Sequence, residues 1–303
     1  MAATAAGKST IREEIKVGRT NTPAFAWPTV VLALVLLATF AASVWLALRG
    51  SISYLASACI NGVVIYSIYT VVHEAVHNNI SSHRHDLRWV DSVLGHMSCF
   101  LLWQFMDHHR ESHLEHHKHT NEDSDPDINA RATLAGYLFV RLPVALLNYF
   151  NPYVLYQECK RFDVPRDGIR RTFIAFGLNT AVLAGLLVAG YGYEVLVLWF
   201  IPWWIGQSIM LTLFTWSPHH DHWETGRYRN SRISEFPGAN WLLLGQGYHL
   251  IHHMMPAVPW YRYKRTFDQL RPILRDNGVR IEGLQPMDPG TYRSEPVQQG
   301  AAR

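Results

Sequence analysis

The sequence has few cysteines, and they are not arranged as a site. Its 303 residues include only Cys59, Cys99 and Cys159, which are odd in number and far apart. This pattern argues against a disulfide framework and against a cysteine-based zinc or iron–sulfur site. The chain also lacks a CxxC pair, a GxGxxG nucleotide fingerprint and the HPGG of a fused cytochrome b5 domain. It therefore has no recognisable electron-transfer cofactor of its own.

The sequence also lacks a large excess of positive or negative charge. The formal net charge is +3, so nothing predicts a nucleic-acid partner. The length alone would allow two soluble domains. However, hydrophobic residues make up 49% of the chain and are concentrated in long runs, which argues against that organisation.

Four of these runs are long enough to cross a bilayer, which takes ~20 residues. Only short links, 49–51 and 190–194, separate the members of each pair, which predicts two helical hairpins. The first run has no small-residue cleavage site after it, so we interpret it as an anchor and not as a signal peptide. The predicted spans are Phe25–Leu48, Ile52–Val72, Phe173–Tyr191 and Val195–Trp216.

The positive charges predict the orientation of these spans. Of the 27 Lys and Arg residues, 26 lie in residues 1–24, 73–172 and 218–303, and only Arg49 lies on a predicted far-side turn. The sequence therefore predicts an integral membrane protein whose two termini and histidine-rich region face the cytoplasm. Residues 1–24 and 281–303 are predicted to be flexible tails on either side of a membrane domain, 25–280.

Two further apolar stretches are not predicted to span. Val93–Met106 is too short, and Leu134–Phe150 has Arg141 and Pro143 near its centre, where a buried arginine is costly. We expect both to be interfacial or re-entrant helices.

Histidine is the abundant residue that needs an explanation. All 17 histidines lie between His73 and His253. Three histidine boxes stand out: HEAVH (first box), HLEHH (second box) and HLIHH (third box). Positions i, i+3 and i+4 lie on one side of a helix, so we expect each box to present its imidazoles to one point. The boxes contain His73 and His77; His113, His116 and His117; and His249, His252 and His253.

Eight imidazoles exceed the four ligands of one zinc ion, so they predict two metal ions. Imidazole sites are compatible with iron, zinc, copper or nickel. A ninth ligand is predicted at His219 or His220, directly after the fourth span. His119 is left open, and the carboxylates of Asp123–Asp127 are expected to form a turn or to hold a ligating histidine. The remaining histidines are expected at the surface or behind the ligands: His83, His85, His96, His108, His109 and His222.

With these boxes in this order and two pairs of spans placed around them, residues from about Ile52 to Phe267 resemble the membrane fatty acid desaturase superfamily. Its members are di-iron enzymes that use O2 to oxidise lipids. The resemblance implies two iron ions, held by the eight box histidines and His219. Within the superfamily, SPHHDHWETGRYRNSR and GQGYHLIHHMMPAVPWYRY resemble the beta-carotene hydroxylase and ketolase branch.

The resemblance implies an all-α membrane oxidoreductase: four transmembrane helices in two hairpins, with a cytoplasmic helical cap around the di-metal site. The favoured reaction is hydroxylation of a carotenoid such as beta-carotene, with O2 as co-substrate. The alternative within the family is a fatty acid or acyl-lipid desaturase. A separate electron donor of the ferredoxin, rubredoxin or cytochrome type is implied. A basic region could dock an acidic donor, although we favour a role in topology and lipid contact; it contains Arg227, Arg229, Arg232, Arg262, Lys264 and Arg265.

Two other functions deserve a test. HEAVH also matches HExxH, the motif of zinc metalloproteases in which Glu74 would be the general base. That interpretation leaves the second and third boxes without a role. A metal transporter would need polar ligands inside the spans, and these spans have almost none. Glu74 therefore has no assigned role in the favoured interpretation.

Overall fold

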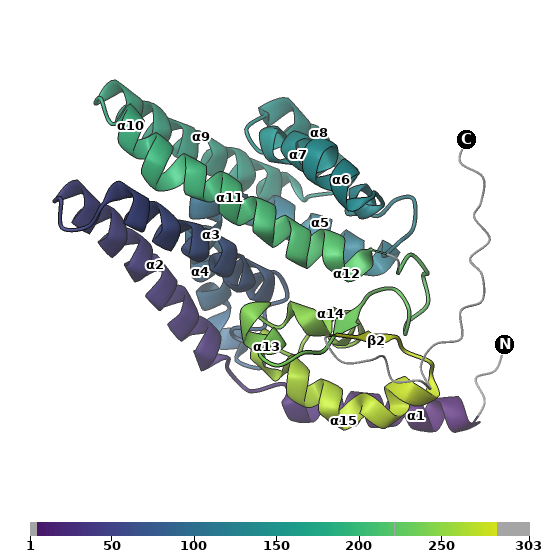
Figure 1. Ribbon diagram of the computed structural model, residues 1–303. Coiled ribbons are helices and arrows are strands. Elements are labelled where there is room, and N and C mark those ends of the chain that lie inside the picture. The colour runs from purple at the N-terminus through teal and green to yellow at the C-terminus, as the bar shows by residue number, and fades with distance from the viewer. Residues whose placement is uncertain (1–4, 221, 284–303) are drawn as a thin grey trace.

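The computed structural model describes residues 5–220 and 222–283, and these residues are mostly helical (Figure 1). The strands described are the short parallel pair β1 (Ile233–Ser234) and β2 (Ile281–Glu282). The prediction of an all-α architecture is confirmed at this level. Long helices form a tilted bundle, and short helices gather at one end of it.

Four helices are long and apolar enough to cross a membrane. All four predicted spans are present, but the second extends further at its end, the third at its start and the fourth at both ends. Two of them carry histidines at their ends, because α3 contains His73 and the fourth run ends at His219. The four are α2 (Trp27–Leu48), α3 (Tyr54–Val76), α9 (Arg166–Val188) and the continuous run Gly192–His219.

The fourth run consists of α10 (Gly192–Val195), η4 (Leu196–Phe200), α11 (Ile201–Leu211), η5 (Thr212–Trp216) and α12 (Ser217–His219). The segments η4 and η5 are π-helical, and each ends two residues before a proline, Pro202 or Pro218. Proline has no N–H, so the carbonyl four residues earlier loses its helical donor. The π-helical turns occur where these prolines interrupt the α-helical bonding.

Helix α4 (Arg88–Leu102) contains most of Val93–Met106, one of the two stretches not expected to span. It ends at Trp103 in the left-handed conformation (φ 53°), and donors from neighbouring helices satisfy its last carbonyls. Asn179 Nδ2 donates to Phe100 O, and Trp199 Nε1 donates to Leu101 O. Because an apolar layer offers no water for these groups, such side-chain donors let a helix end there.

The second such stretch is a bent pair of helices. Helices α6 (Leu134–Gly136), η3 (Tyr137–Arg141) and α7 (Leu142–Asn148) form one arm, and α8 (Pro152–Arg161) turns from it by 93°. The geometry is that of a broken span or a re-entrant segment.

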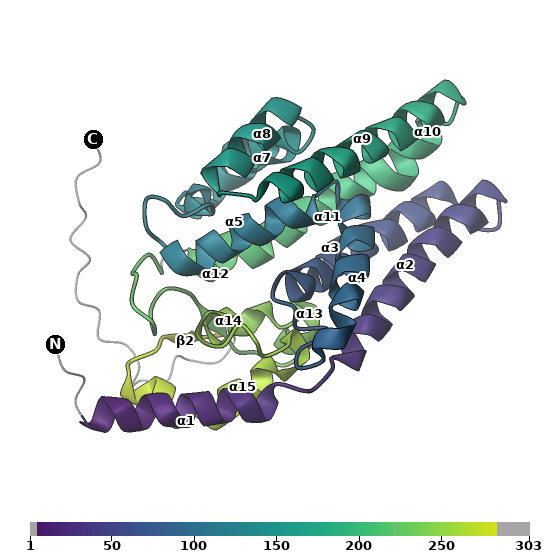
Figure 2. The ribbon, with the colours of Figure 1, turned by 180° about the vertical axis from the view of Figure 1, so that it is seen from behind.

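The expected N-terminal tail is partly a helix, which corrects the prediction for residues 1–24. Helix α1 (Ala5–Asn21) lies along α15 (Tyr263–Asp276) (Figure 2). Asn21 Nδ2 donates to Gln269 Oε1 at 2.6 Å, and the fully buried Glu14 pairs with Arg227 at 2.9 Å. These partners are distant in the sequence, which is why the local pattern of residues 1–24 did not predict a packed helix.

At the other end of the chain, β2 lies inside the predicted tail 281–303, of which residues 284–303 are outside the described residues. The elements not yet given are α5 (Met106–His119), α13 (Ala239–Leu242), α14 (His249–Met254), η1 (His85–Leu87), η2 (Ile128–Ala130), η6 (Gln246–Tyr248) and η7 (Trp260–Arg262).

Candidate metal centre

Four helices deliver the nine predicted ligands to one buried region. The first box lies at the end of α3, and the second box lies on α5. The third box forms most of α14, and His219 is the last residue of α12. His220 is not in the region, because its ring stacks on Trp216 with a centroid distance of 4.1 Å.

Eight of the histidines form two groups of four, each with ring nitrogens within 4.8 Å of one another. The first group contains His73, His77, His113 and His252, and the second contains His116, His219, His249 and His253. His117 lies between them: its Nε2 is 2.8 Å from His252 Nε2, and its ring stacks on that of His253 at 4.6 Å. Two groups support the prediction of two metal ions.

The second and third boxes do not each converge on one point, which corrects that expectation. In the second box, His113 joins the first group and His116 joins the second. In the third box, His252 joins the first group, whereas His249 and His253 join the second. Successive helical residues differ by about 100° around the axis, so positions i+3 and i+4 diverge. Each HxxHH box therefore contributes to both groups.

Four of these histidines contact oxygen atoms through their Nδ1 nitrogens. The distances are 2.8 Å from His116 Nδ1 to Asp125 Oδ1, 2.6 Å from His249 Nδ1 to Gln246 Oε1, and 3.1 Å from His219 Nδ1 to the carbonyl of Asn230. His252 Nδ1 lies 2.9 Å from the Tyr263 hydroxyl. A carbonyl or carboxylate oxygen can only accept, so it keeps the proton on Nδ1 and leaves the Nε2 lone pair free for a metal.

The Nε2 nitrogens, which lie near other histidines, provide a test of whether a metal fits. His219 Nε2 and His249 Nε2 are 3.2 Å apart, and each has its proton held at Nδ1. Neither Nε2 can donate, so two lone pairs face each other in a buried site. A cation between the groups would turn this repulsion into coordination. The all-nitrogen donor set suits a transition metal and not Ca²⁺ or Mg²⁺, which prefer oxygen.

Burial also keeps these imidazoles neutral. It lowers the pKa values of His113, His249, His252 and His253 well below the ordinary range, and that of His117 to about 2. The exception is His116, because Asp127 and Asp125 raise its pKa against the opposing effect of burial. Neutral imidazoles are the form that binds metals.

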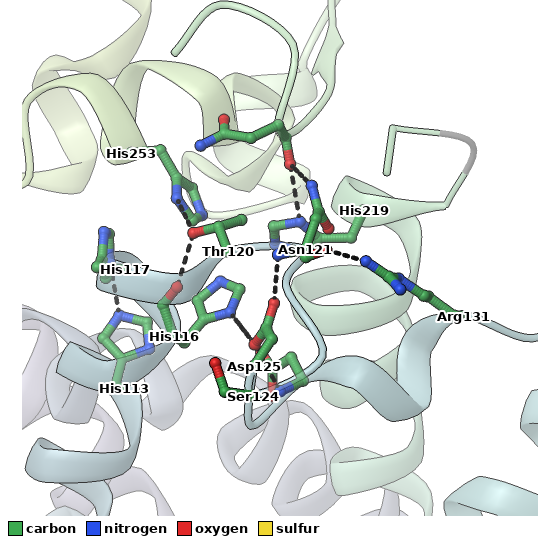
Figure 3. A network of polar contacts seen from close by, with 12 residues as sticks. His113, His116, His117, Thr120, Asn121, Ser124, Asp125, Arg131, His219 and His253 are labelled. Carbon is green, nitrogen blue, oxygen red and sulfur yellow. Dashed lines mark hydrogen bonds and ion pairs between the residues drawn. The ribbon is translucent and has the colours of Figure 1, made fainter. Parts of the chain in front are cut away.

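The loop after α5 both forms a turn and holds a histidine. Asp125 Oδ2 accepts from the backbone N–H of Asn121 at 2.7 Å, and Oδ1 accepts from that of Asp127 at 2.8 Å as well as contacting His116 (Figure 3). Asn121 Nδ2 lies within 2.9 Å of three carbonyl oxygens in 222–230, the segment that follows α12. Both expectations for Asp123–Asp127 therefore describe parts of one arrangement.

Several residues that support this region were not predicted from the sequence. Gln246 lies one helical turn before His249, so its spacing was a usable signal. Tyr263 had no such signal, because only the fold brings it to His252. Arg110 was also missed: it donates to the carbonyls of Ala75 and Val76, and thereby joins α5 to the end of α3.

The histidines outside the two groups contact mainly carboxylates. His108 pairs with Glu158, and His119 with Glu122. His222 is buried against Glu282 and is not a surface residue. His109 lines a cavity beside His113.

That cavity has a volume of about 350 Å³ and is bordered by α5, the bent pair and the end of the fourth run. His113 and His116 reach it from the two groups, and Phe105, Val140 and Leu155 provide apolar wall. The space lies next to both groups, so a molecule bound there would be adjacent to any metal they hold.

Comparisons with known proteins agree with this geometry. The family model described as fatty acid desaturase matches residues 49–284. A beta-carotene ketolase of Paracoccus sp. (strain PC1) is 24% identical over 246 residues, covering 78% of this chain and 90% of that protein. The ketolase of Paracoccus sp. (strain N81106 / MBIC 01143) is 26% identical over 208 residues, or 66% and 73% of the two chains. A sphingolipid delta(4)-desaturase of Drosophila melanogaster is 26% identical over 257 residues, or 79% and 72%.

Proposed function

Because this chain belongs to the fatty acid desaturase family, we propose that it is a membrane-bound lipid oxidoreductase that uses O2 and two iron ions. The observation that carries the proposal is the pair of buried histidine groups, in each of which four ring nitrogens lie within 4.8 Å of one another. The proposed ligands are the eight box histidines and His219. When bound, the iron would supply the activation of O2, which no side chain can provide.

The residues of the chain would bind and orient the substrate and exclude water. The cavity beside His113 and His116 would hold a substrate C–H bond against the site. Small differences in position would decide the product, because removal of a second hydrogen gives a double bond whereas oxygen transfer gives an alcohol. The neutral imidazoles need not act as bases in this chemistry.

For the substrate, we propose a carotenoid such as beta-carotene, with hydroxylation as the reaction. The two relatives named beta-carotene ketolase support the carotenoid as substrate, and hydroxylation is our proposal for the reaction. The alternative is desaturation of an acyl lipid, which the similarity to a sphingolipid desaturase supports. Both substrates are long and apolar, and both would reach the site from the bilayer.

The proposed orientation places the termini and the metal site on the cytoplasmic side, with the spans arranged as two hairpins beneath a helical cap. The distribution of Lys and Arg supports it. We also propose a separate soluble electron donor. Docking at the basic C-terminal region has weak support, since several of its charges are already paired: Arg227 with Glu14, Arg229 with Glu224, Arg232 with Glu282 and Lys264 with Asp268.

Metal analysis combined with product analysis tests the proposal. The purified protein should contain two irons per chain, and a host that makes beta-carotene should accumulate an O2-dependent oxidised carotenoid. An altered fatty-acid profile with unchanged carotenoid would favour the alternative. One zinc per chain without an O2-dependent product would contradict the proposal and would favour a zinc protease with Glu74 as its base.

A further inference from the structure

The glutamate of HEAVH is a buried carboxylate that the proposed chemistry does not use. Glu74 is fully buried on α3, directly after the proposed ligand His73. Its Oε1 accepts the backbone N–H of Trp260 at 3.2 Å, and its Oε2 has no hydrogen-bond partner among the described residues. A buried carboxylate with one backbone donor is poorly compensated, because burial penalises an unpaired charge.

No lysine or arginine in the described part of the chain forms an ion pair with Glu74. The one positively chargeable atom within ion-pair distance is His73 Nδ1, at 3.9 Å from Oε1. That nitrogen is itself buried and has no hydrogen-bond partner. A histidine nitrogen without a hydrogen-bond partner therefore lies 3.9 Å from a buried carboxylate oxygen, behind the first group.

The second group also has a buried carboxylate behind it, and this one is within hydrogen-bond distance of a histidine. Asp125 is 2% exposed, and its Oδ1 lies 2.8 Å from His116 Nδ1. Each group of four imidazoles thus has one buried carboxylate near one of its members: Glu74 at 3.9 Å from His73 Nδ1, and Asp125 at 2.8 Å from His116 Nδ1. A divalent ion bound by neutral ligands in a buried site needs nearby negative charge, and a carboxylate behind a ligating histidine supplies it.

We infer that Glu74 is a positioning residue that provides the negative charge for the metal of the first group, as Asp125 does for the second. This inference rests on the proposed function. When His73 binds a metal through Nε2, its remaining proton lies on Nδ1, and the Oε1 atom of Glu74 is 3.9 Å from that nitrogen. Through Trp260, the same carboxylate links α3 to the segment that follows the third box, so it also holds His73 beside His252, whose Nε2 atoms are 3.0 Å apart.

The substitution Glu74→Gln separates charge from packing. Glutamine keeps an oxygen that can accept from Trp260 N, but it removes the negative charge. Asp125→Asn removes the charge behind the second group and, with it, one of the two oxygens that accept backbone N–H groups. Asp91→Asn is the matched control, because Asp91 is a buried carboxylate whose oxygens accept from Ile80 N and Ser81 N, and it has no contact with a proposed ligand.

The experiment measures the release of iron from the purified full-length enzyme into an excess of chelator. We expect Glu74→Gln to weaken one of the two irons 10–100-fold, the usual effect of losing such a partner. Asp125→Asn should weaken the other iron, and the double variant should weaken both. Asp91→Asn should release iron as the wild type does. Far-UV circular dichroism of each variant would show whether the fold is retained.

Three outcomes would overturn the inference. Glu74→Gln could hold both irons as tightly as the wild type, which would leave the proposed function intact. Glu74→Gln and Asp125→Asn could act on the same iron, which would contradict one carboxylate per group. A wild-type protein that binds a single metal would instead contradict the proposed function, and the inference with it.

Discussion

The side-chain amide of Asn61 on α3 donates to the backbone carbonyl of Leu198 in η4, with an Nδ2–O distance of 2.6 Å. Leu198 lies four residues before Pro202, so its carbonyl lacks the helical N–H that it would otherwise accept. Asn61 is fully buried between spans. One polar side chain in an apolar helix thereby satisfies the defect that a proline creates in its neighbour.

Replacing Asn61 by leucine should therefore destabilise the bundle. The carbonyl of Leu198 would lose its donor in an apolar environment, and hydrogen bonds between such helices contribute about 0.6–2 kcal/mol. Thermal unfolding in detergent should show a lower midpoint for Asn61→Leu. Asn61→Gln, which retains an amide, should lose less; equal losses in the two variants would show that the hydrogen bond is unimportant.

The crossing of α3 and α11 gives a second prediction. A Cβ atom on Gly206 would lie 2.8 Å from the carbonyl oxygen of Gly62 and 2.9 Å from Cβ of Ile65, which is closer than real Cβ contacts allow. Gly206→Val should force these helices apart and reduce the yield of folded protein. Gly185→Val is the control, because nothing lies within 4 Å of the corresponding Cβ. Size-exclusion profiles in detergent would compare the two variants, and similar profiles would contradict the prediction.

Some features of the fold and of the candidate site could be predicted from the sequence, and others could not. Long apolar runs identified all four candidate spans, since span length and composition are local properties. The three boxes identified seven of the eight histidines of the two groups for the same reason, and the eighth, His219, directly follows the fourth predicted span. In contrast, the split of each HxxHH box between groups depends on how α5 and α14 are rotated relative to each other. The packing of α1 on α15 and the contact of Tyr263 with His252 likewise depend on partners that only the fold brings together.

The hydroxyl of Tyr263 contacts His252 Nδ1, the ring nitrogen that is not proposed to bind metal, and this contact should strengthen metal binding. Tyr263→Phe should preserve the buried ring but leave His252 Nδ1 without the hydroxyl at 2.9 Å. Loss of such a partner typically lowers metal affinity 10–100-fold. Iron content after dialysis against a weak chelator would measure the effect. Tyr248→Phe is the control, because Tyr248 is equally buried but packs on Phe267 and not on a histidine; equal iron in both variants would contradict the prediction.

Acid should release the metal and destabilise the protein. In the unfolded chain, histidines bind protons near a pKa of about 6.5. In the folded chain, burial lowers the pKa values of His249, His252 and His253 well below this, and that of His117 to about 2. The unfolded state therefore binds more protons as the pH falls below about 6.5, so stability decreases with acidification. Iron content and melting temperature measured between pH 8 and pH 5 should fall together; retention of both at pH 5 would contradict this.

A substitution in the cavity beside the two groups should impair substrate binding without changing metal binding. Ala145 lines this cavity of about 350 Å³, so Ala145→Phe should occupy part of the space that a substrate needs. Product formation should fall at least tenfold, while the iron content should remain that of the wild type, because Ala145 is not a proposed ligand. The control is Ala181→Phe on α9, an exposed position that does not line the cavity. If Ala145→Phe and Ala181→Phe form product equally well from beta-carotene and from acyl lipids, the substrate must bind elsewhere.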